Sequence, residues 1–403
     1  MIRGGDIRNG TIVCDDTKRV TAAVSEQFRR TVLRGGEIVL NLIAEPGHSA
    51  VVPNELAGHN VSRDVAVIPL IETISARFLD YYMKSPFAID WLRARLQGSV
   101  TQKINLGTLR ELPVPLPRFD EQRLIAGMLG DLDDRIALLR DTNTTLEAIA
   151  LALFKSWFVD FDPVSAKIQG LAPAGMDEAT AALFPDGFNA AEIGEIPRGW
   201  TVLPVGDAVE CVGGATPDTK DERYWSPAQH AWTTPKDLSG LASPVLLRTE
   251  RLISAQGLAR IGSGLLPAGS LLMSSRAPIG YLAIAQLPLA INQGYIAMLP
   301  GGRLPPLYML FWCRQNMELI KARANGSTFM EISKKAFRPI PALVPPEPVV
   351  SAFEHTASPL FARIVENERQ AQTLAQLRDT LLPRLLSGQL RLTEGLDADA
   401  ALA

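Results

Sequence analysis

An internal repeat constrains the fold of this 403-residue chain more than any other feature of its sequence. When the sequence is shifted by 228 residues, the positions that coincide are Gly98-Ser99 with Gly326-Ser327, Ile104 with Ile332, Pro113 with Pro341, and Pro117 with Pro345. Solenoid repeats are about 20–50 residues long, so this much longer repeat predicts a duplicated domain. Each half is expected to form a mixed globular unit, a proline-rich exit and a long helix.

A heptad pattern predicts that the long helices pair. In the first half, apolar residues recur at alternating spacings of four and three, which is typical of a coiled-coil seam. Its positions are Ile125, Leu129, Leu132, Ile136, Leu139, Asn143, Leu146, Ala150, Leu153 and Trp157. The equivalent positions in the second half are Phe353, Ala357, Leu360, Ile364, Asn367, Ala371, Leu374, Arg378, Leu381 and Leu385. Surface helices average about eleven residues, so we expect a coiled coil in preference to two separate surface helices.

One asparagine and several prolines qualify this helical pattern. Asn143 is the one polar residue of the first seam, where it could fix the register at a cost in stability. Pro359 is expected to kink the second helix or to delay its start. Before the first helix, Pro113, Pro115 and Pro117 stiffen the exit from the globular unit, because proline continues neither a sheet nor a helix. We expect Pro339 to Pro348 to play the same part in the second copy.

The two halves differ at their starts. Residues 161–195 are expected to form a connector with one short helix near Met176–Leu183. The second globular unit then begins near Ile196, with strand alternation around Val202–Val205 and a turn at Gly213–Pro217. In the first half, Ile2–Ile7 already aligns with the region around Thr233–Leu238, so about 35 residues have no counterpart. We therefore expect an incomplete first unit, whose sheet has an unpaired edge.

Composition excludes several classes of protein. The net charge is −3, so DNA binding would have to arise from local features. Three widely separated cysteines suit reduced thiols, and no apolar run reaches the roughly 20 residues of a membrane span. We expect a cytoplasmic protein that is not bound to a membrane. The four histidines are isolated, and the sequence has no nucleotide-binding lysine loop, so we predict a binding scaffold that holds no metal.

Several strings, taken in order, resemble one family. They are "ELPVPLPRFDEQRLIAGML", "LALFKSWFVDFDPVSAKIQG", "EIPRGW", "GATP" and "LRDTLLPRLLSGQL". Together with the internal repeat, they make the chain similar to the DNA-specificity subunits of type I restriction–modification systems. The resemblance implies an α+β protein with pseudo-twofold duplication, in which two mixed α/β target-recognition domains are separated by two long helices that form an antiparallel coiled coil.

The resemblance also assigns a segment to each part of this architecture. The expected segments are a first recognition domain at 1–117, incomplete at its N-terminus, a first spacer helix at 118–160, the connector at 161–195, a second recognition domain at 196–345, a second spacer helix at 346–390 and a disordered tail at 391–403.

By the same resemblance, the chain is not an enzyme and binds no cofactor of its own. It would read a bipartite site in double-stranded DNA and recruit modification subunits, which use S-adenosylmethionine, and restriction subunits, which use ATP and Mg. Two alternatives stay open. One is a truncated or regulatory adaptor that binds methylase subunits without full DNA reading. The other is the specificity half of a fused restriction–methylation enzyme.

Local charge indicates where DNA would bind. The net charge is +5 over residues 200–345, +2 over residues 1–117 and −3 over residues 118–160, as phosphate neutralisation by the globular units requires. The DNA-binding candidates in the second unit are Lys220, Arg223, Lys236, Arg276, Lys334 and Lys335, with hydroxyls from Ser327 and Thr328. Those in the first unit are Arg3, Arg8, Lys18, Arg19, Arg63 and Lys103, with hydroxyls from Ser99 and Thr101.

Overall fold

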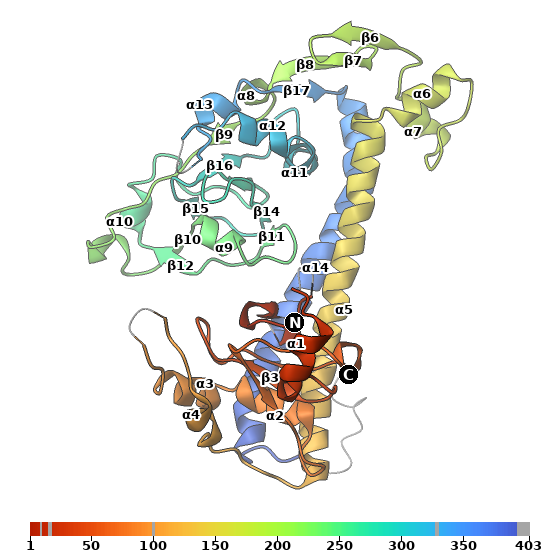
Figure 1. The fold of residues 1–403 in the computed structure, drawn as a ribbon. Coiled ribbons are helices and arrows are strands. Elements are labelled where there is room, and N and C mark those ends of the chain that lie inside the picture. Colours follow the sequence, from red (N-terminus) through yellow and green to blue (C-terminus); the bar gives the residue numbers. More distant parts are fainter. Residues whose placement is uncertain (9, 15–17, 99–100, 327–329, 393–403) are drawn as a thin grey trace. The chain divides into compact units, whose positions relative to one another are not determined.

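The computed structural model describes residues 1–8, 10–14, 18–98, 101–326 and 330–392. The chain forms two compact units. Unit 1 consists of two segments, Met1–Ala137 and Gln372–Ala403, and unit 2 is the single segment Leu138–Ala371. Two 40-residue helices, α5 (Phe119–Phe158) and α14 (Glu347–Leu386), run through both units (Figure 1). The boundary between the two units therefore lies within both helices.

Unit 1 is built on a small antiparallel sheet. Its other helices are α1 (Ala22–Gln27), α2 (Ala76–Met83), α3 (Pro86–Arg93) and α4 (Leu106–Arg110), with 3-10 turns η1 (Gly4–Asp6), η2 (Arg29–Thr31) and η3 (Asn54–Leu56). Its strands are β1 (Ile7–Arg8), β2 (Thr11–Ile12), β3 (Ile38–Asn41), β4 (Ser49–Val51) and β5 (Val65–Ile68). The strand order is β4-β3-β5, and β1 pairs separately with β2.

Local sequence explains these elements. All four residues of β3 are buried, as expected for the central strand of a sheet covered on both faces. The hydroxyl of Ser75 accepts from the N–H of Phe78 and begins α2, and Ser85 caps α3 in the same way, with Pro86 at the first helical position. Apolar side chains of α2 and α3 then pack against the sheet in one core.

The two long helices pack against each other and against α2 in unit 1. Leu129 of α5 is fully buried in a cluster with Phe78 of α2 and with Leu382 and Leu385 of α14. Arg378, the charged residue at a seam position, forms an ion pair with Asp133 across the helices. The hydroxyl of Tyr81 donates to the same carboxylate at 2.6 Å. A charge can occupy the seam here because its partner lies directly opposite.

Unit 2 is larger. Its shorter helices are α6 (Asp162–Ile168), α7 (Glu178–Ala182), α8 (Val205–Ala208), α9 (Pro235–Leu238), α10 (Ala255–Leu258), α11 (Pro306–Gln315), α12 (Met317–Ala322) and α13 (Lys334–Phe337), with one 3-10 turn, η4 (Glu222–Tyr224). Its strands are β6 (Phe188–Ala191), β7 (Gly194–Pro197), β8 (Thr201–Pro204), β9 (Cys211–Val212), β10 (His230–Thr233), β11 (Val245–Leu246), β12 (Arg251–Ile253), β13 (Leu271–Ser274), β14 (Leu282–Ala285), β15 (Ala290–Ile291), β16 (Tyr295–Met298) and β17 (Pro341–Val344).

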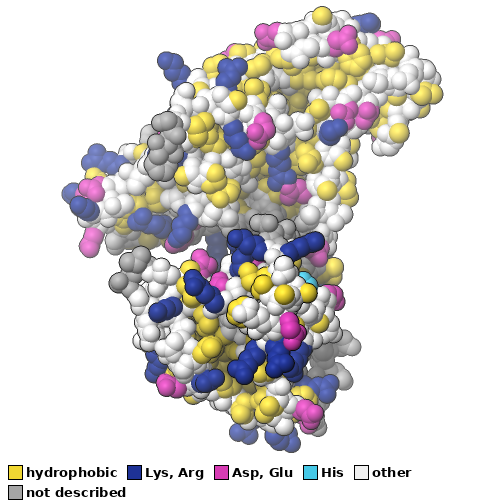
Figure 2. All heavy atoms as spheres, viewed as in Figure 1, with side chains coloured by type: hydrophobic (Ala, Val, Ile, Leu, Met, Phe, Trp, Pro, Cys, Tyr) yellow, Lys and Arg dark blue, Asp and Glu magenta, His cyan; other side chains and the backbone are white. Residues whose placement is uncertain are grey.

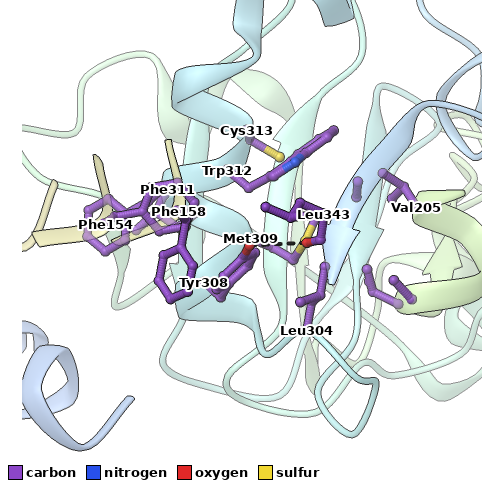
Figure 3. Close-up of a cluster of buried hydrophobic side chains, with 14 of the residues drawn as sticks. Phe154, Phe158, Val205, Leu304, Tyr308, Met309, Phe311, Trp312, Cys313 and Leu343 are labelled. Carbon is purple, nitrogen blue, oxygen red and sulfur yellow. Dashed lines mark hydrogen bonds between the residues drawn. The ribbon is translucent and has the colours of Figure 1, made fainter. Parts of the chain in front are cut away.

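The core of unit 2 lies between a five-stranded sheet and the long helices. The sheet has the order β11-β14-β13-β16-β9, beside smaller sheets β12-β10-β15, β17-β8 and β6-β7. Helix α11 packs on the sheet, and its Tyr308 hydroxyl donates to the carbonyl of Leu343 in β17 at 3.2 Å (Figure 3). Phe154 and Phe158 of α5 pack edge-on against Tyr308 and Phe353. Half of each long helix thus belongs to the core of unit 2.

A buried polar network joins the two helices in unit 2. The side-chain amide of Asn367 donates to the side-chain oxygen of Asn143 at 2.8 Å, and Asn143 donates to the carboxylate of Glu368 at 3.1 Å. The hydroxyl of Ser243, next to β11, donates to the same carboxylate at 2.8 Å. Asn143 therefore faces the polar residue of the other seam, a pairing that only one register of the helices allows.

Replacing Asn143 with leucine is expected to lower the free energy of unfolding by about 1–3 kcal/mol, because the buried amide of Asn367 loses its acceptor. The double variant Asn143→Leu/Asn367→Leu should recover much of that loss, since it removes both polar partners. Chemical denaturation followed by circular dichroism gives the required energies. If the double variant is destabilised by the sum of the two single effects, the two amides do not act as a pair.

Two expectations about proline were wrong, and the expectation about the connector was incomplete. Helix α14 begins at Glu347, so Pro359 does not delay it; this proline is exposed, and water can satisfy the carbonyl it leaves without a donor. Pro341 begins strand β17, which forms a two-stranded sheet with β8 in the described part of the chain, so its missing N–H interrupts no larger sheet. In the connector, α7 confirms the short helix predicted near Met176–Leu183, but the segment also holds α6 and the β6–β7 hairpin, which were not predicted.

The central strands of the two units have the same pairing. In unit 1, β3 pairs antiparallel with β4 and β5; in unit 2, β13 pairs antiparallel with β14 and β16. Strand β9 pairs with the free side of β16, whereas among the described residues no strand pairs with the corresponding side of β5. The expected tail at 391–403 lies outside the described residues after Leu392. None of the described helices has the length and apolar content needed to cross a membrane.

Candidate nucleic-acid interface

Four segments of unit 2 meet at one end of the five-stranded sheet. Strand β13 ends beside the start of β16, and the N–H of Ser275 donates to the carbonyl of Gly294 at 2.8 Å. The N–H of Ala215, in the loop after β9, donates to Ile291 at 3.1 Å, and the N–H of Ile332, just before α13, donates to Ser275 at 3.0 Å. We call this group of segments (residues 213–220, 275–281, 292–294 and 330–337) the loop end of unit 2.

Buried groups hold the loop end in place. Tyr295, at the start of β16, donates its hydroxyl proton to the carbonyl of Thr234 at 2.5 Å. Burial raises the pKa of this phenol, so it stays a protonated donor at neutral pH. Burial also raises the pKa of the Cys211 thiol, in β9, to about 11, which keeps it in its unreactive form. The scaffold under the loops is therefore fixed, and the exposed side chains above it are free to meet a ligand.

The predicted basic residues of unit 2 divide into two groups. Lys220, Lys334 and Lys335 are exposed, and the described residues provide no ion pair for any of them. Three others form ion pairs instead: Arg223 with Asp221 at 2.7 Å, Lys236 with Glu250 at 2.9 Å and Arg276 with Glu331 at 3.9 Å. The number of charges in the sequence does not distinguish the two groups, because the formation of ion pairs depends on where the side chains lie in space. Ser327 and Thr328 lie outside the described residues.

In unit 1, Lys18, Arg19, Arg63, Thr101 and Lys103 are exposed. Arg3 forms an ion pair with Asp6 at 3.1 Å, and the guanidinium of Arg8 donates to the carbonyl of Gly5 at 2.7 Å. Lys103 lies in a backbone bridge to Ile43, beside the end of β3. Ser99 lies outside the described residues. Lys103 therefore lies at the end of the sheet where β3 ends, as does Arg63, two residues before β5.

The sequence reasoning missed a cluster of arginine and aromatic side chains in unit 2. The guanidinium carbon of Arg251, in β12, lies 3.6 Å from the ring centroid of Trp225 and 5.4 Å from that of Trp232. Arg260, after α10, lies over the ring of Tyr224 and donates from its Nε to the Tyr224 hydroxyl at 3.0 Å. Figure 2 shows lysine and arginine side chains gathered over the β12 and α10 end of unit 2. The signal in the sequence was a basic stretch interleaved with aromatic residues.

Two adjacent glycines test the rigidity of the loop end. A Cβ atom on Gly214 would lie 1.8 Å from the carbonyl oxygen of Ile291, whereas one on Gly213 would meet only the flexible side chain of Lys334, at 3.2 Å. We expect Gly214→Ala to cost about 1–3 kcal/mol, because the backbone must move. Gly213→Ala should cost well under about 1 kcal/mol. Thermal melting of both variants measures this difference. Equal shifts of the melting temperature in the two variants would contradict the prediction.

Comparison with known proteins matches both halves of the chain to the same family. The model of the family described as "Type I restriction modification DNA specificity domain" matches residues 1–148 and 197–349. The chain is 26% identical over 385 residues to the type I restriction enzyme MjaIX specificity subunit of Methanocaldococcus jannaschii, covering 94% of this chain and 83% of that protein. It is 24% identical over 434 residues to the HindI specificity subunit of Haemophilus influenzae, covering 97% and 94%.

A solved structure is also similar, that of the type I restriction–modification system S subunit from M. genitalium. The alignment has a TM-score of 0.48 and 16% sequence identity, and it covers 87% of this chain and 83% of that one. The family match, in contrast, takes in well over half of the chain and includes most of unit 1 and unit 2. The chain therefore belongs to the family of type I restriction–modification DNA specificity proteins.

Proposed function

We propose that this chain is the DNA-binding specificity subunit of a type I restriction–modification complex, and that each unit reads one half of a split site. The observation that carries the proposal is the repeated strand pairing around β3 and β13. The family match falls on both copies, which supports a specificity role for each. Two such domains on one chain would bind DNA cooperatively, because once the first domain is bound, binding of the second becomes an intramolecular event.

The two copies present different chemistry at equivalent places. In unit 1, Ile43 and Lys103 are joined by a backbone bridge at the end of the sheet; in unit 2, the corresponding bridge joins Arg276 to Glu331. A second bridge in each copy, from Gln97 to Lys103 and from Asn325 to Glu331, follows the same plan. A common backbone with different side chains would give two half-sites of different sequence, since bases are read through side-chain donors and acceptors.

The long helices would set the unread gap between the half-sites. Each is continuous for 40 residues, and each contributes to the core of both units. A helix rises about 1.5 Å per residue, so a continuous pair with one register defines one length. The Asn143–Asn367 pair supports a unique register, because any slip of one helix turn would bury each amide without its partner.

The proposed partners are double-stranded DNA, modification subunits and restriction subunits. The relatives are specificity subunits by name, which favours a role in choosing the DNA sequence and leaves the chemistry to other chains. We therefore propose that S-adenosylmethionine is bound by the modification subunits, that ATP and Mg are bound by the restriction subunits, and that this chain works beside DNA in the cytoplasm without a catalytic centre.

Methylation mapping of genomic DNA tests this function. Cells that carry the gene should show adenine methylation at a split motif, and deletion of the gene should abolish methylation at that motif alone. Restoring the gene on a plasmid is the control. A methylation pattern that is unchanged by the deletion would contradict the proposal. So would methyl transfer from labelled S-adenosylmethionine to DNA by the purified chain without any partner.

A further inference from the structure

We propose that Arg251 reads a guanine in the half-site bound by unit 2, and that Trp225 positions its guanidinium for this contact. The proposal rests on the proposed function and adds a specificity-determining residue to it. The first support is that the side chain of Arg251 is exposed and held in place. Its guanidinium lies on the ring of Trp225, and its position on β12 is opposite Trp232 of β10.

Trp225 is itself fixed. Its indole N–H donates to the carbonyl of Asp218 at 3.0 Å, and its ring meets that of Trp232 edge-on, at 5.2 Å and 82°. Trp232 is buried, and its own indole N–H donates to the carbonyl of Ala215 at 3.2 Å. Both acceptors belong to the loop after β9, so the stack that carries Arg251 is tied to the loop end of unit 2.

The donors of the Arg251 guanidinium are free to meet a ligand. Within the described part of the chain, no hydrogen bond or ion pair engages this group. Glu250, the residue before it in the chain, is already engaged by Lys236, and Asp221, four residues before Trp225, is engaged by Arg223. An arginine held flat on an aromatic ring keeps its planar edge of N–H groups available. It has therefore lost part of its rotamer freedom before any ligand arrives.

This arrangement suits a base more than a phosphate. Arginine donates two parallel hydrogen bonds to O6 and N7 of guanine in the major groove, and this bidentate contact depends on a fixed orientation. The exposed lysines of the loop end, Lys220, Lys334 and Lys335, are flexible point charges of the kind that neutralise phosphates. A division of labour follows, in which the lysines hold the backbone and Arg251 distinguishes one base pair.

The test introduces Arg251→Lys into the chromosomal gene, so that the chain meets its own partners, and maps adenine methylation across the genome. Lysine keeps the charge but loses the bidentate geometry. Discrimination for guanine at one position of one half-site should fall roughly tenfold to a hundredfold, while the other positions of the motif keep their preference. Arg303→Lys is the matched control, since this exposed arginine follows β16 at the end of the sheet away from the loop end.

Changes at Trp225 test its positioning role. Trp225→Leu should relax the same position as Arg251→Lys, and Trp225→Phe should restore most of the preference, because a flat ring is again present beneath the guanidinium. Melting temperatures of the purified complexes show whether each variant is folded. Relaxation at several positions of both half-sites, in a folded Trp225→Leu complex, would overturn the positioning role.

Two results would overturn the guanine contact. One is an unchanged motif in the Arg251→Lys strain. The other is a phosphate signature, in which Arg251→Ala weakens binding equally for all sequences and lowers the slope of log affinity against log salt by about one. Failure of the proposed function is a separate result, since the unaltered strain would then show no split motif that depends on the gene.

Discussion

Replacing Leu129 with aspartate is expected to remove at least about 4 kcal/mol from the stability of unit 1. The side chain is 0% exposed, in a cluster formed by α2, α5 and α14. The change deletes a fully buried apolar group and places an unpaired carboxylate among Phe78, Leu382 and Leu385. Losses of this size exceed those of most single substitutions, so the helix pair should separate in this region.

Leu138→Asp is the matched control for this experiment, because it places the same charge on the same helix at a side chain that is 54% exposed. Its cost should stay below about 1 kcal/mol, which is the scale of surface changes and of helix propensity. Chemical denaturation of both variants gives the two energies, and methylation mapping shows whether recognition survives. Equal losses in the two variants would mean that burial along α5 does not hold unit 1 together.

Phe154→Ala is expected to cost about 3–5 kcal/mol in unit 2, the range for truncating a buried phenylalanine. Phe154 is 2% exposed and touches four other aromatic rings, those of Phe158, Tyr308, Phe311 and Phe353. Figure 3 shows it beside Phe158 and Phe311, where α5 meets α11. Its loss would leave a cavity at the junction of the long helix with the recognition unit.

Ile149→Ala provides the comparison, since Ile149 lies on the same helix and is 50% exposed. It should change stability by roughly 0.5 kcal/mol or less. Thermal melting followed by near-ultraviolet circular dichroism reports on both variants, because the aromatic cluster dominates that signal. If Phe154→Ala melts like the Ile149 variant, the C-terminal half of α5 is a separate spacer, as the sequence had suggested, and not part of the core of unit 2.

The helix pair could be read from the sequence because it depends on a local period. Apolar residues at spacings of three and four lie on one face of any helix, whatever surrounds it. Asn143 and Asn367 were visible as the polar residues of their seams, but their contact required the antiparallel register found in the structure. Pro359 misled the prediction because the penalty of a proline depends on whether its side of the helix is exposed, which its sequence position does not tell.

The DNA-binding candidates were harder to predict, since charge alone does not reveal pairing. Arg223 and Lys236 look as available as Lys334 in the sequence, yet carboxylates engage both. Arg251 was overlooked because its partner Trp225 lies between η4 and β10, far from Arg251 in the chain. The pairing of strands brings together segments that are distant in sequence. The internal repeat could not predict this pairing, so it could not predict the contacts that depend on it.

The sequence by itself therefore determined the two long helices and their seam, since these rest on order and spacing along the chain, and its resemblance to known proteins identified the family. Only the tertiary structure decided which halves of the helices belong to which unit, which basic side chains are already paired, and which arginine is held on an aromatic ring. The physical reason is that burial and side-chain pairing are properties of neighbours in space, and chain order fixes those neighbours only within a helix or a turn.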